Sequence, residues 1–397
     1  MTPRLSVPSP RGAMMLAFTF LALAGCSDDA PSEEGLQSIS ESLRTDVITR
    51  YADVVHLAYS DTLAGVMALD ATVDAFIADP TEQTMSSAKA AWLAVRDVYG
   101  RTEAFRFYDG PIDNEATGPE GQINAWPMDE VYLDYVDGMP EAGLINDASI
   151  EMTTATLVDA NEVGGESNIS TGFHAIEFLL WGQDLDDNGP GARPASDYAT
   201  APNSDRRAQA LGLLTELLIE DIQTLVDAWD PQGSNHYRAE WLALEDAEAV
   251  RRMLRGIGAL SKGELAGERI VVAYENRSQE DEHSCFSDNT HNDIIANASA
   301  IQVVWTGDWD NTAGPGLDSL VTEVDGVLAA STSAEIARSI ALAESIPAPF
   351  DQWLAEGVAD DTFGRTAIRD TYTALQDQGD LLAEVAAALD VAISLDI

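Results

Sequence analysis

Apolar residues recur every three or four positions along most of this chain, and this spacing constrains the fold more than any other feature. Residues 36–77 show it clearly, with Val47, Tyr51 and Val54 in succession. Positions three and four apart share one face of an α-helix, so the spacing predicts amphipathic helices. Alternating patterns bounded by hairpin turns are scarce. The predicted fold class is all-α, with two packed helical bundles.

Breaks rich in Gly, Pro and acidic residues divide the helical pattern. The break at 183–203 separates an N-terminal bundle, 36–190, from a C-terminal bundle, 204–397. Each half opens with two long helices and then enters an acidic loop, as an old duplication would produce, but the identity is too low to establish a repeat. Apart from the helix that holds His174, the expected helices cover residues 36–77, 84–107, 128–136, 150–158, 206–229, 237–260, 263–274, 293–305, 317–330, 334–343 and 363–395.

The first 25 residues have the form of a secretory signal. A basic start precedes an apolar run that is too short to span a membrane, and Leu-Ala-Gly-Cys closes the run. A small residue directly before Cys26 resembles the lipobox of bacterial lipoproteins, which implies cleavage there and acylation of the thiol. An ordinary signal peptide with an incidental cysteine is the alternative. Residues 26–35 are predicted to form a flexible tether, and Ser27 favours the outer membrane, facing the periplasm.

Charge and motifs exclude several function classes. The chain has 68 acidic and 21 basic residues, a formal net charge of −47, which repels nucleic acid and anionic head groups. Nucleic acid is therefore no expected partner, and the membrane is contacted through the lipid anchor only. The chain contains no HExxH, Gly-rich phosphate loop, GxSxG or CxxC, which argues against standard zinc proteases, nucleotide enzymes, serine hydrolases and thiol redox proteins.

The segment Ser170–Gly182 places His174 and Glu177 three residues apart among apolar neighbours. The two side chains share a helix face, and a buried acid is costly unless it is paired or bound to a cation. A hydrogen-bonded buried pair and the first half of a divalent metal site both satisfy this requirement. A third interpretation pairs Glu177 with an arginine, such as Arg96 or Arg269, in a pocket for a small ligand or partner protein.

Other acidic residues and one histidine could complete such a site. Glu103 is expected either in a surface ion pair with an arginine or as an acid that points inward. The acidic loop at 108–127 also suits a solvated connection, and Asp288 or Asn289 suits the cap of the helix that follows. The segment 280–291 gathers two histidines, one cysteine and four acids. The further candidate ligands are Glu103, Asp113, Glu115, Asp129, Asp288 and His291.

Three motifs together resemble the imelysin family. They are Trp126-Pro127, the GxHxxE sequence of Gly172–Glu177 followed by Phe-Leu-Leu-Trp-Gly, and the segment Glu280–Asp293, which is similar to the iron-regulated branch. The resemblance implies a two-bundle helical fold with a site near the bundle interface. It also implies an association with iron uptake or divalent metal, and an assignment to metallopeptidases that cleave insulin. By motif match, His174 and Glu177 are the residues that carry over.

Two main function classes follow. In the first, a lipid-anchored protein binds iron or zinc through His174 and Glu177 and serves iron uptake alongside other uptake components. In the second, a metallopeptidase uses Glu177 as a metal ligand or as a general base. A peptidase of this kind requires three ligands and an open position, and the sequence reveals no third ligand.

Overall fold

A computed structural model describes residues 35–186, 188–233 and 236–395. These residues belong to one compact unit, Glu34–Ile397. The predicted signal peptide, Cys26 and the tether up to residue 34 lie outside the described residues. No described helix is both long and apolar enough to cross a bilayer.

The all-α prediction is confirmed. Within the described residues, extended pairing is limited to two isolated β-bridges. Six short 3₁₀ helices cover Gly35–Ser38, Glu103–Phe105, Leu144–Asn146, Ala195–Tyr198, Gln279–Asp281 and Asp351–Trp353. The longer helical elements are α1 (Glu41–Ala78), α2 (Glu82–Gly100), α3 (Glu120–Ile123), α4 (Glu130–Leu133), α5 (Thr154–Ala160), α6 (Gly172–Trp181), α7 (Ser204–Trp229), α8 (Tyr237–Trp241), α9 (Asp246–Ala259), a π-helix (Leu260–Val271), α10 (Val272–Asn276), α11 (Thr290–Thr306), α12 (Leu317–Val324), α13 (Gly326–Ala343) and α14 (Phe363–Ala388).

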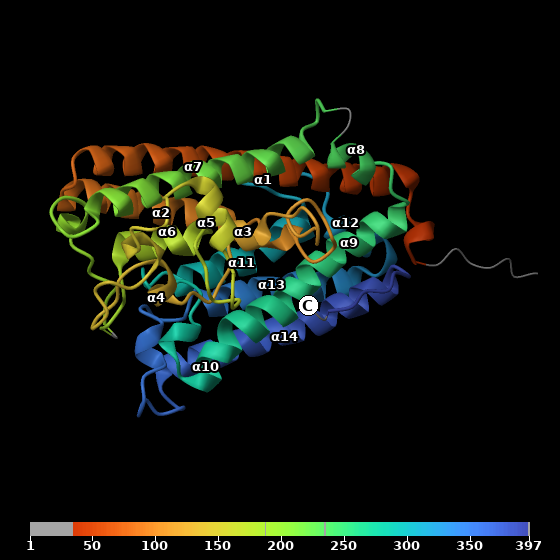
Figure 1. Ribbon diagram of the computed structural model, residues 1–397. Coiled ribbons are helices and arrows are strands. Elements are labelled where there is room, and N and C mark those ends of the chain that lie inside the picture. The colour runs from red at the N-terminus through yellow and green to blue at the C-terminus, as the bar shows by residue number, and fades with distance from the viewer. Residues whose placement is uncertain (1–34, 187, 234–235, 396–397) are drawn as a thin grey trace, which may run out of the picture. The chain divides into compact units, whose positions relative to one another are not determined.

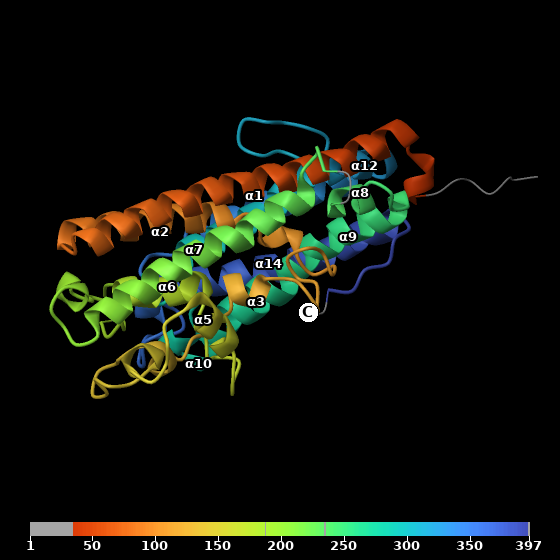
Figure 2. The same cartoon turned by 45° about the horizontal axis from the view of Figure 1, so that its top comes forward.

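Long helices pack in two groups with α11 between them. One group contains α1, α2 and α7, and the other contains α13, α14 and the π-helix. Helix α11 contacts α2 on one side and both α13 and the π-helix on the other. Helices α1 and α7, which the sequence assigns to different bundles, run side by side in both views (Figures 1 and 2). The bundle boundary between residues 190 and 204 stays a prediction.

The end of helix α2 differs from the end that the sequence pattern predicts. The helix starts with a capping box between Thr81 and Thr84, but the predicted continuation to residue 107 is wrong, because α2 ends at Gly100. The amide and the hydroxyl of Thr102 both donate to the Tyr99 carbonyl at 2.7 Å, which closes the last turn. The chain then turns inward through a 3₁₀ helix that buries Glu103.

Several C-terminal boundaries also differ from prediction. The break expected between 330 and 334 lies instead at Asp325, whose carboxylate accepts hydrogen bonds from the first turn of α13. Helix α14 ends at Ala388 rather than at 395, and Asp390 has a φ of 56°, which a continuing helix does not permit. The helix expected over 237–260 is interrupted between α8 and α9, and α9 leads directly into the π-helix.

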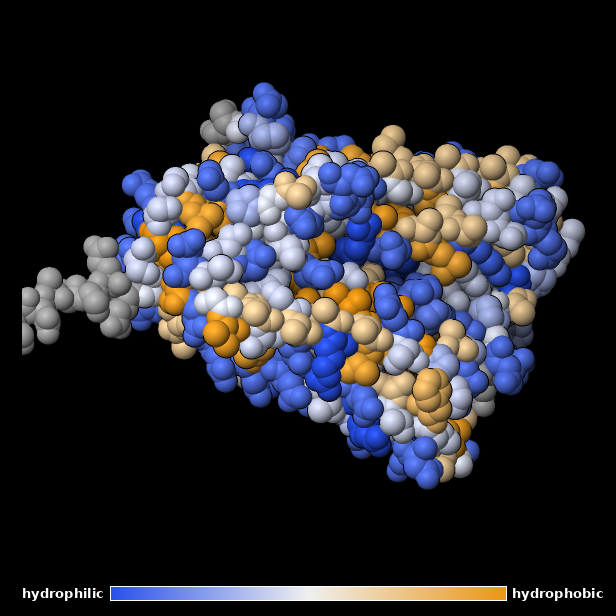
Figure 3. All heavy atoms as spheres, turned by 180° about the vertical axis from the view of Figure 1, so that it is seen from behind, coloured by the Kyte–Doolittle hydropathy of each residue, from blue (hydrophilic) through white to orange (hydrophobic). Residues whose placement is uncertain are grey.

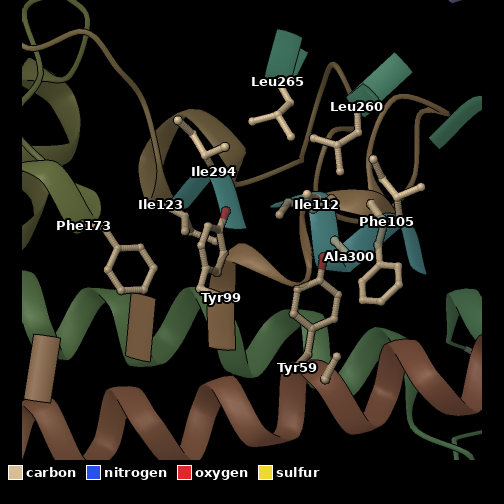
Figure 4. Packing of buried hydrophobic residues seen from close by; sticks show 14 of the residues in the cluster. Tyr59, Tyr99, Phe105, Ile112, Ile123, Phe173, Leu260, Leu265, Ile294 and Ala300 are labelled. Atoms are coloured by element: carbon tan, nitrogen blue, oxygen red, sulfur yellow. The ribbon is translucent and has the colours of Figure 1, made fainter. Parts of the chain in front are cut away.

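The hydrophobic core combines residues from both halves of the sequence. Figure 4 shows Tyr59, Tyr99, Phe173, Leu265 and Ile294 pointing into one region between the helices. All five are buried. Cys285 is a free cysteine, so the described residues contain no disulfide. Stability therefore comes from the burial of apolar surface, at roughly 25 cal/mol per Å².

Candidate functional site

Helix α6 carries the GxHxxE motif, and all of its residues are buried. Gly172 begins the helix with a φ of 81°, and a Cβ atom there would lie 2.4 Å from the Ile123 carbonyl oxygen. Only glycine permits both this backbone conformation and this close approach. The Trp92 indole donates a hydrogen bond of 3.0 Å to the Phe173 carbonyl. These contacts fix the first turn, and with it the position of the next residue, His174.

His174 and Glu177 form a buried pair whose second partner comes from a distant segment. His174 Nδ1 lies 2.9 Å from Glu177 Oε2. Glu177 Oε1 accepts from the backbone N–H of Ser287 at 2.9 Å and from its hydroxyl at 2.6 Å. Burial raises the pKa of Glu177 to about 8, although the Ser287 hydrogen bonds act in the opposite direction. Burial, together with Arg96, lowers the pKa of His174 well below its usual value.

A second buried imidazole, that of His283, lies against His174. The ring centroids are 4.9 Å apart and the planes are inclined by 62°. His283 Nδ1 lies 2.9 Å from Asp293 Oδ2. The Nε2 atoms of His174 and His283 both lack a hydrogen-bond partner among the protein atoms. Burial, then Arg269, lowers the pKa of His283 to about 3, so both rings are neutral at neutral pH.

Arg96 and Asp293 form a buried ion pair behind these rings. Arg96 Nη2 lies 3.0 Å from Asp293 Oδ2, and Nη1 donates to Asn124 Oδ1 at 2.6 Å. The guanidinium also lies over the Phe173 ring, 5.0 Å from its centroid. Burial would raise the pKa of Asp293, but Arg96 and His283 overcome this effect and lower it. Arg96 thus balances the charge of Asp293, and in the part of the chain that the structure describes it forms its ion pair with Asp293 and not with Glu177.

Glu103 occupies the adjacent part of the interior. Its Oε2 lies 2.7 Å from Arg106 Nη1 and 2.7 Å from Arg269 Nη2. Burial favours the neutral acid, but Arg269 and then Arg106 lower the pKa of Glu103 far below its ordinary value. Glu264 on the π-helix gives Arg269 a second partner at 2.8 Å. Glu103 therefore points inward, as the second of the two alternatives predicted, and its ion pairs with arginine are buried rather than on the surface.

A pocket of about 210 Å³ opens beside this network, and His283 lies in its wall. The pocket contains acids, arginines and one tryptophan, so a polar or metal-bound ligand suits it better than an apolar one. The other wall residues include Arg106, Glu120, Asn124, Trp126, Glu264 and Arg269.

The remaining predicted ligands make other contacts or are exposed, and none of the contacts described for them is with the two imidazoles. Asp113 accepts hydrogen bonds from backbone N–H groups of its own loop, including that of Gly110 at 2.7 Å. Glu115 is exposed, and Asp129 caps α4 through Val131 N–H at 3.1 Å. His291 is half-buried. Asp113 therefore stabilises its own loop, and Asp129 stabilises the start of α4.

Asp288 lies in a different group. One carboxylate oxygen from each of Asp184, Asp288 and Asp351 lies within 4.8 Å of the others, the one such group of three metal-capable side chains in the described residues. The predicted helix start after Asp288 is confirmed in position, since Asn289 is the N-cap of α11. Neither side chain makes the expected capping hydrogen bond; the Asn289 amide donates instead to Asp293 at 3.1 Å.

Comparison with known proteins identifies the family. Residues 55–382, which make up more than half of the chain, match the imelysin family. The chain belongs to the imelysin family. This confirms the resemblance predicted from the GxHxxE helix and from the segment Glu280–Asp293.

Individual imelysin relatives cover nearly all of the chain. Iron-regulated protein A of Synechococcus elongatus is 26% identical over 377 residues, 90% of each chain. A crystal structure assigned to an iron-regulated protein A precursor of Parabacteroides distasonis has a TM-score of 0.64 at 20% identity, and covers 88% of this chain and 97% of its own. An imelysin-like protein of Psychrobacter arcticum has a TM-score of 0.64 at 15% identity, with 90% and 98% covered. At these identities the two structures show a shared fold.

The candidate site contains three residues that the sequence did not select as site residues. They are His283, Ser287 and Asp293, and all three are buried. Each lies within or at the end of the segment Glu280–Asp293, so its density of histidines and acids was the available signal. Which members of that segment face α6 depends on a contact between residues more than a hundred positions apart.

Proposed function

We propose that this imelysin-family protein binds a divalent metal ion, iron or zinc, through the buried imidazoles of His174 and His283. The observation that carries the proposal is the pair of neutral rings, 4.9 Å apart, with unpartnered nitrogens. An unpartnered buried polar atom is costly, and the lone pair of a neutral imidazole is a common metal ligand. Asp293 balances the charge of Arg96, and Glu103 balances the charge of Arg269. These ion pairs limit the repulsion between the two arginines and a bound cation.

Glu177 has a different role in this proposal from the one expected from sequence. Both of its oxygens accept hydrogen bonds, one from Ser287 and one on the side of His174 Nδ1. A metal ion bound at Nε2 would favour the ionised form of Glu177, which then accepts the Nδ1 proton of His174 and fixes the tautomer whose Nε2 lone pair faces the metal. Glu177 therefore acts as a positioning residue, and Ser287 holds it in place.

The names of two relatives support a connection with iron, since both are called iron-regulated protein A. We infer that the protein serves iron uptake or its regulation, together with other uptake components. The signal sequence and Cys26 support a location in the outer membrane, facing the periplasm, with the lipid as anchor.

Metal content of the purified mature protein tests the proposal. After dialysis against Zn²⁺, or against Fe²⁺ without oxygen, we expect the parent chain to retain one ion that both His174→Ala and His283→Ala lose. Glu177→Gln should weaken binding by about 10–100-fold, the usual effect of removing such a positioning carboxylate. His291→Ala is the matched control, because it removes a half-buried histidine outside the pair. Equal metal content in all variants would refute the proposal.

Peptide hydrolysis is the second candidate function. It is favoured by the pocket beside His283, which gives room for a bound chain near the proposed metal. It is disfavoured by Glu177, which is fully buried and already hydrogen-bonded. Cleavage of insulin chains that a chelator abolishes, and that His174→Ala and Glu177→Gln both lose, would establish it. Cleavage that survives in these variants would indicate a contaminating protease.

A further inference from the structure

The pocket beside the imidazole pair runs from the protein surface to His283. Glu162 and Glu166 line it and are both exposed, so this end is open to solvent. His283 lines the same pocket but is only 2% exposed, and its Nε2 has no hydrogen-bond partner among the protein atoms. The volume of about 210 Å³ equals that of roughly seven water molecules, so a hydrated divalent ion fits. The pocket therefore links solvent to a buried ring that we propose as a metal ligand.

Negative charge prevails in the wall of this pocket. Its charged side chains are four glutamates and two arginines, so the acids exceed the bases by two. Arg106 pairs with Glu120 at 3.0 Å, and Arg269 pairs with Glu264 at 2.8 Å. Both arginines also pair with the buried Glu103 behind the wall. The positive charges of the wall are therefore already compensated.

The uncompensated negative charge lies at the exposed end of the pocket. Within the described residues, neither Glu162 nor Glu166 forms an ion pair with a basic side chain. Both belong to the loop after α5, and the Asn161 amide ties this loop to α3 by donating to the Gly121 carbonyl at 2.9 Å. A cleft lined by charge of one sign attracts the opposite ion and raises its association rate by about 10–1,000-fold. The two carboxylates are placed to act in this way on a cation.

We propose that this pocket admits the metal to the imidazole pair as a hydrated cation, and that Glu162 and Glu166 attract the cation and repel anionic chelates. The proposal rests on the metal-binding function proposed above and adds the form in which the metal is taken up. An anionic chelate meets two uncompensated carboxylates, and the arginines of the wall are each paired with glutamate. A cation is attracted along the same path and exchanges a water ligand for the unpartnered Nε2 of His283.

The rate of Zn²⁺ uptake by the full mature protein tests the role of the two glutamates. A zinc-sensitive dye in a stopped-flow instrument reports the free ion. At about 0.02 M salt we expect association to be roughly 3–10-fold slower in Glu162→Gln/Glu166→Gln than in the parent, because part of the attracting field is lost. The difference should shrink at about 0.5 M salt, where screening is strong. Both proteins should still bind one ion at saturation, because these glutamates are not the proposed ligands.

Glu323→Gln/Glu384→Gln is the matched control, because it removes the same charge from exposed glutamates outside the pocket wall. Its association rate should stay close to that of the parent. Equal rates in the parent and in Glu162→Gln/Glu166→Gln, or an equal loss of rate in the control, would overturn the proposal and leave the metal site standing. Absence of uptake by the parent, or uptake that persists in His283→Ala, would refute the metal site and this proposal with it.

Nitrilotriacetate, which holds Zn²⁺ as an anionic complex, tests the form in which the metal enters. The free Zn²⁺ concentration is held constant while the total concentration of the complex is increased. We expect the uptake rate to stay constant, because only the free cation passes the two glutamates. A rate that rises with the concentration of the complex would show that the anionic chelate itself enters the pocket, contrary to the proposal.

Discussion

Burial raises the pKa of each buried acid in this protein, and the partners of the acid decide whether its pKa ends above or below the ordinary value. Arginines lower the pKa of Glu103 despite its burial. Among the described residues, no arginine forms an ion pair with Glu177 or Asp221, and burial raises the pKa of Glu177 to about 8 and that of Asp221 to about 6. The sequence shows which of these acids stand among apolar residues. It does not show which of them will meet an arginine.

Asp221 provides a pH-dependent prediction at this scale. It is 8% exposed, and the Gln122 amide donates to both of its oxygens, at 2.7 and 2.9 Å. Its folded-state pKa is raised, so its contribution to stability is complete below about pH 4 and is lost as the pH rises through about 6. We expect Asp221→Asn to increase the free energy of unfolding by roughly 1–2 kcal/mol at pH 8, but not at pH 4.

Urea unfolding of both chains at the two pH values measures this difference. Glu216→Gln, which removes an exposed charge from the same helix, is the control and should show a much smaller pH-dependent change. A constant difference between Asp221→Asn and the parent across this pH range would contradict the assigned pKa.

Helix α6 depends closely on its neighbours. Thr171, at its N-cap, makes no side-chain capping bond, and the helix is held instead by packing and by the approach of Gly172 to the chain around Ile123. A helix of ten residues is marginal on its own. The position of His174 therefore depends on contacts that α6 makes with other elements.

Gly172→Ala tests this dependence. The new Cβ would lie 2.4 Å from the Ile123 carbonyl oxygen, at a residue with a φ of 81°. We expect a loss of roughly 1–3 kcal/mol of stability, together with weaker metal binding at the imidazole pair. Gly326→Ala is the matched control, because Gly326 also begins a helix but has open space around its Cβ position. Equal stabilities of the two variants in urea unfolding would show that the approach to Ile123 is not constraining.

At the scale of the whole molecule, charge opposes the compact state. The formal net charge is −47, and the chain has only two lysines, Lys89 and Lys262. The face in Figure 3 is covered mainly by hydrophilic residues, with hydrophobic groups between them. Mutual repulsion of surface carboxylates lowers stability at low ionic strength.

We therefore expect salt to stabilise the protein. Raising NaCl from about 0.05 M to about 0.5 M shortens the Debye length from roughly 14 Å to roughly 4 Å and should raise the Tm. EDTA in all samples removes any contribution of divalent metal ions, and KCl should act like NaCl if screening is the cause. A Tm that falls with salt would show that attractive ion pairs outweigh the net repulsion.

The sequence by itself determined the helical fold class, the buried helix with His174 and Glu177, and the family. Helical spacing and a short motif are properties of neighbouring residues, so they can be read without knowledge of the fold. The same spacing predicted that α2 continues to residue 107. The helix ends at Gly100 instead, because the chain turns at Thr102. The tertiary structure decided this boundary by placing Glu103 among arginines.

Only the tertiary structure decided the partners of the motif. Glu177 meets Ser287 across 110 positions, and His174 faces His283. Asp184, Asp288 and Asp351 likewise come together from three separate segments. A local pattern shows that a buried acid needs compensation, because desolvation depends on its own surroundings. It cannot show what supplies that compensation, because the partner is selected by how distant helices pack.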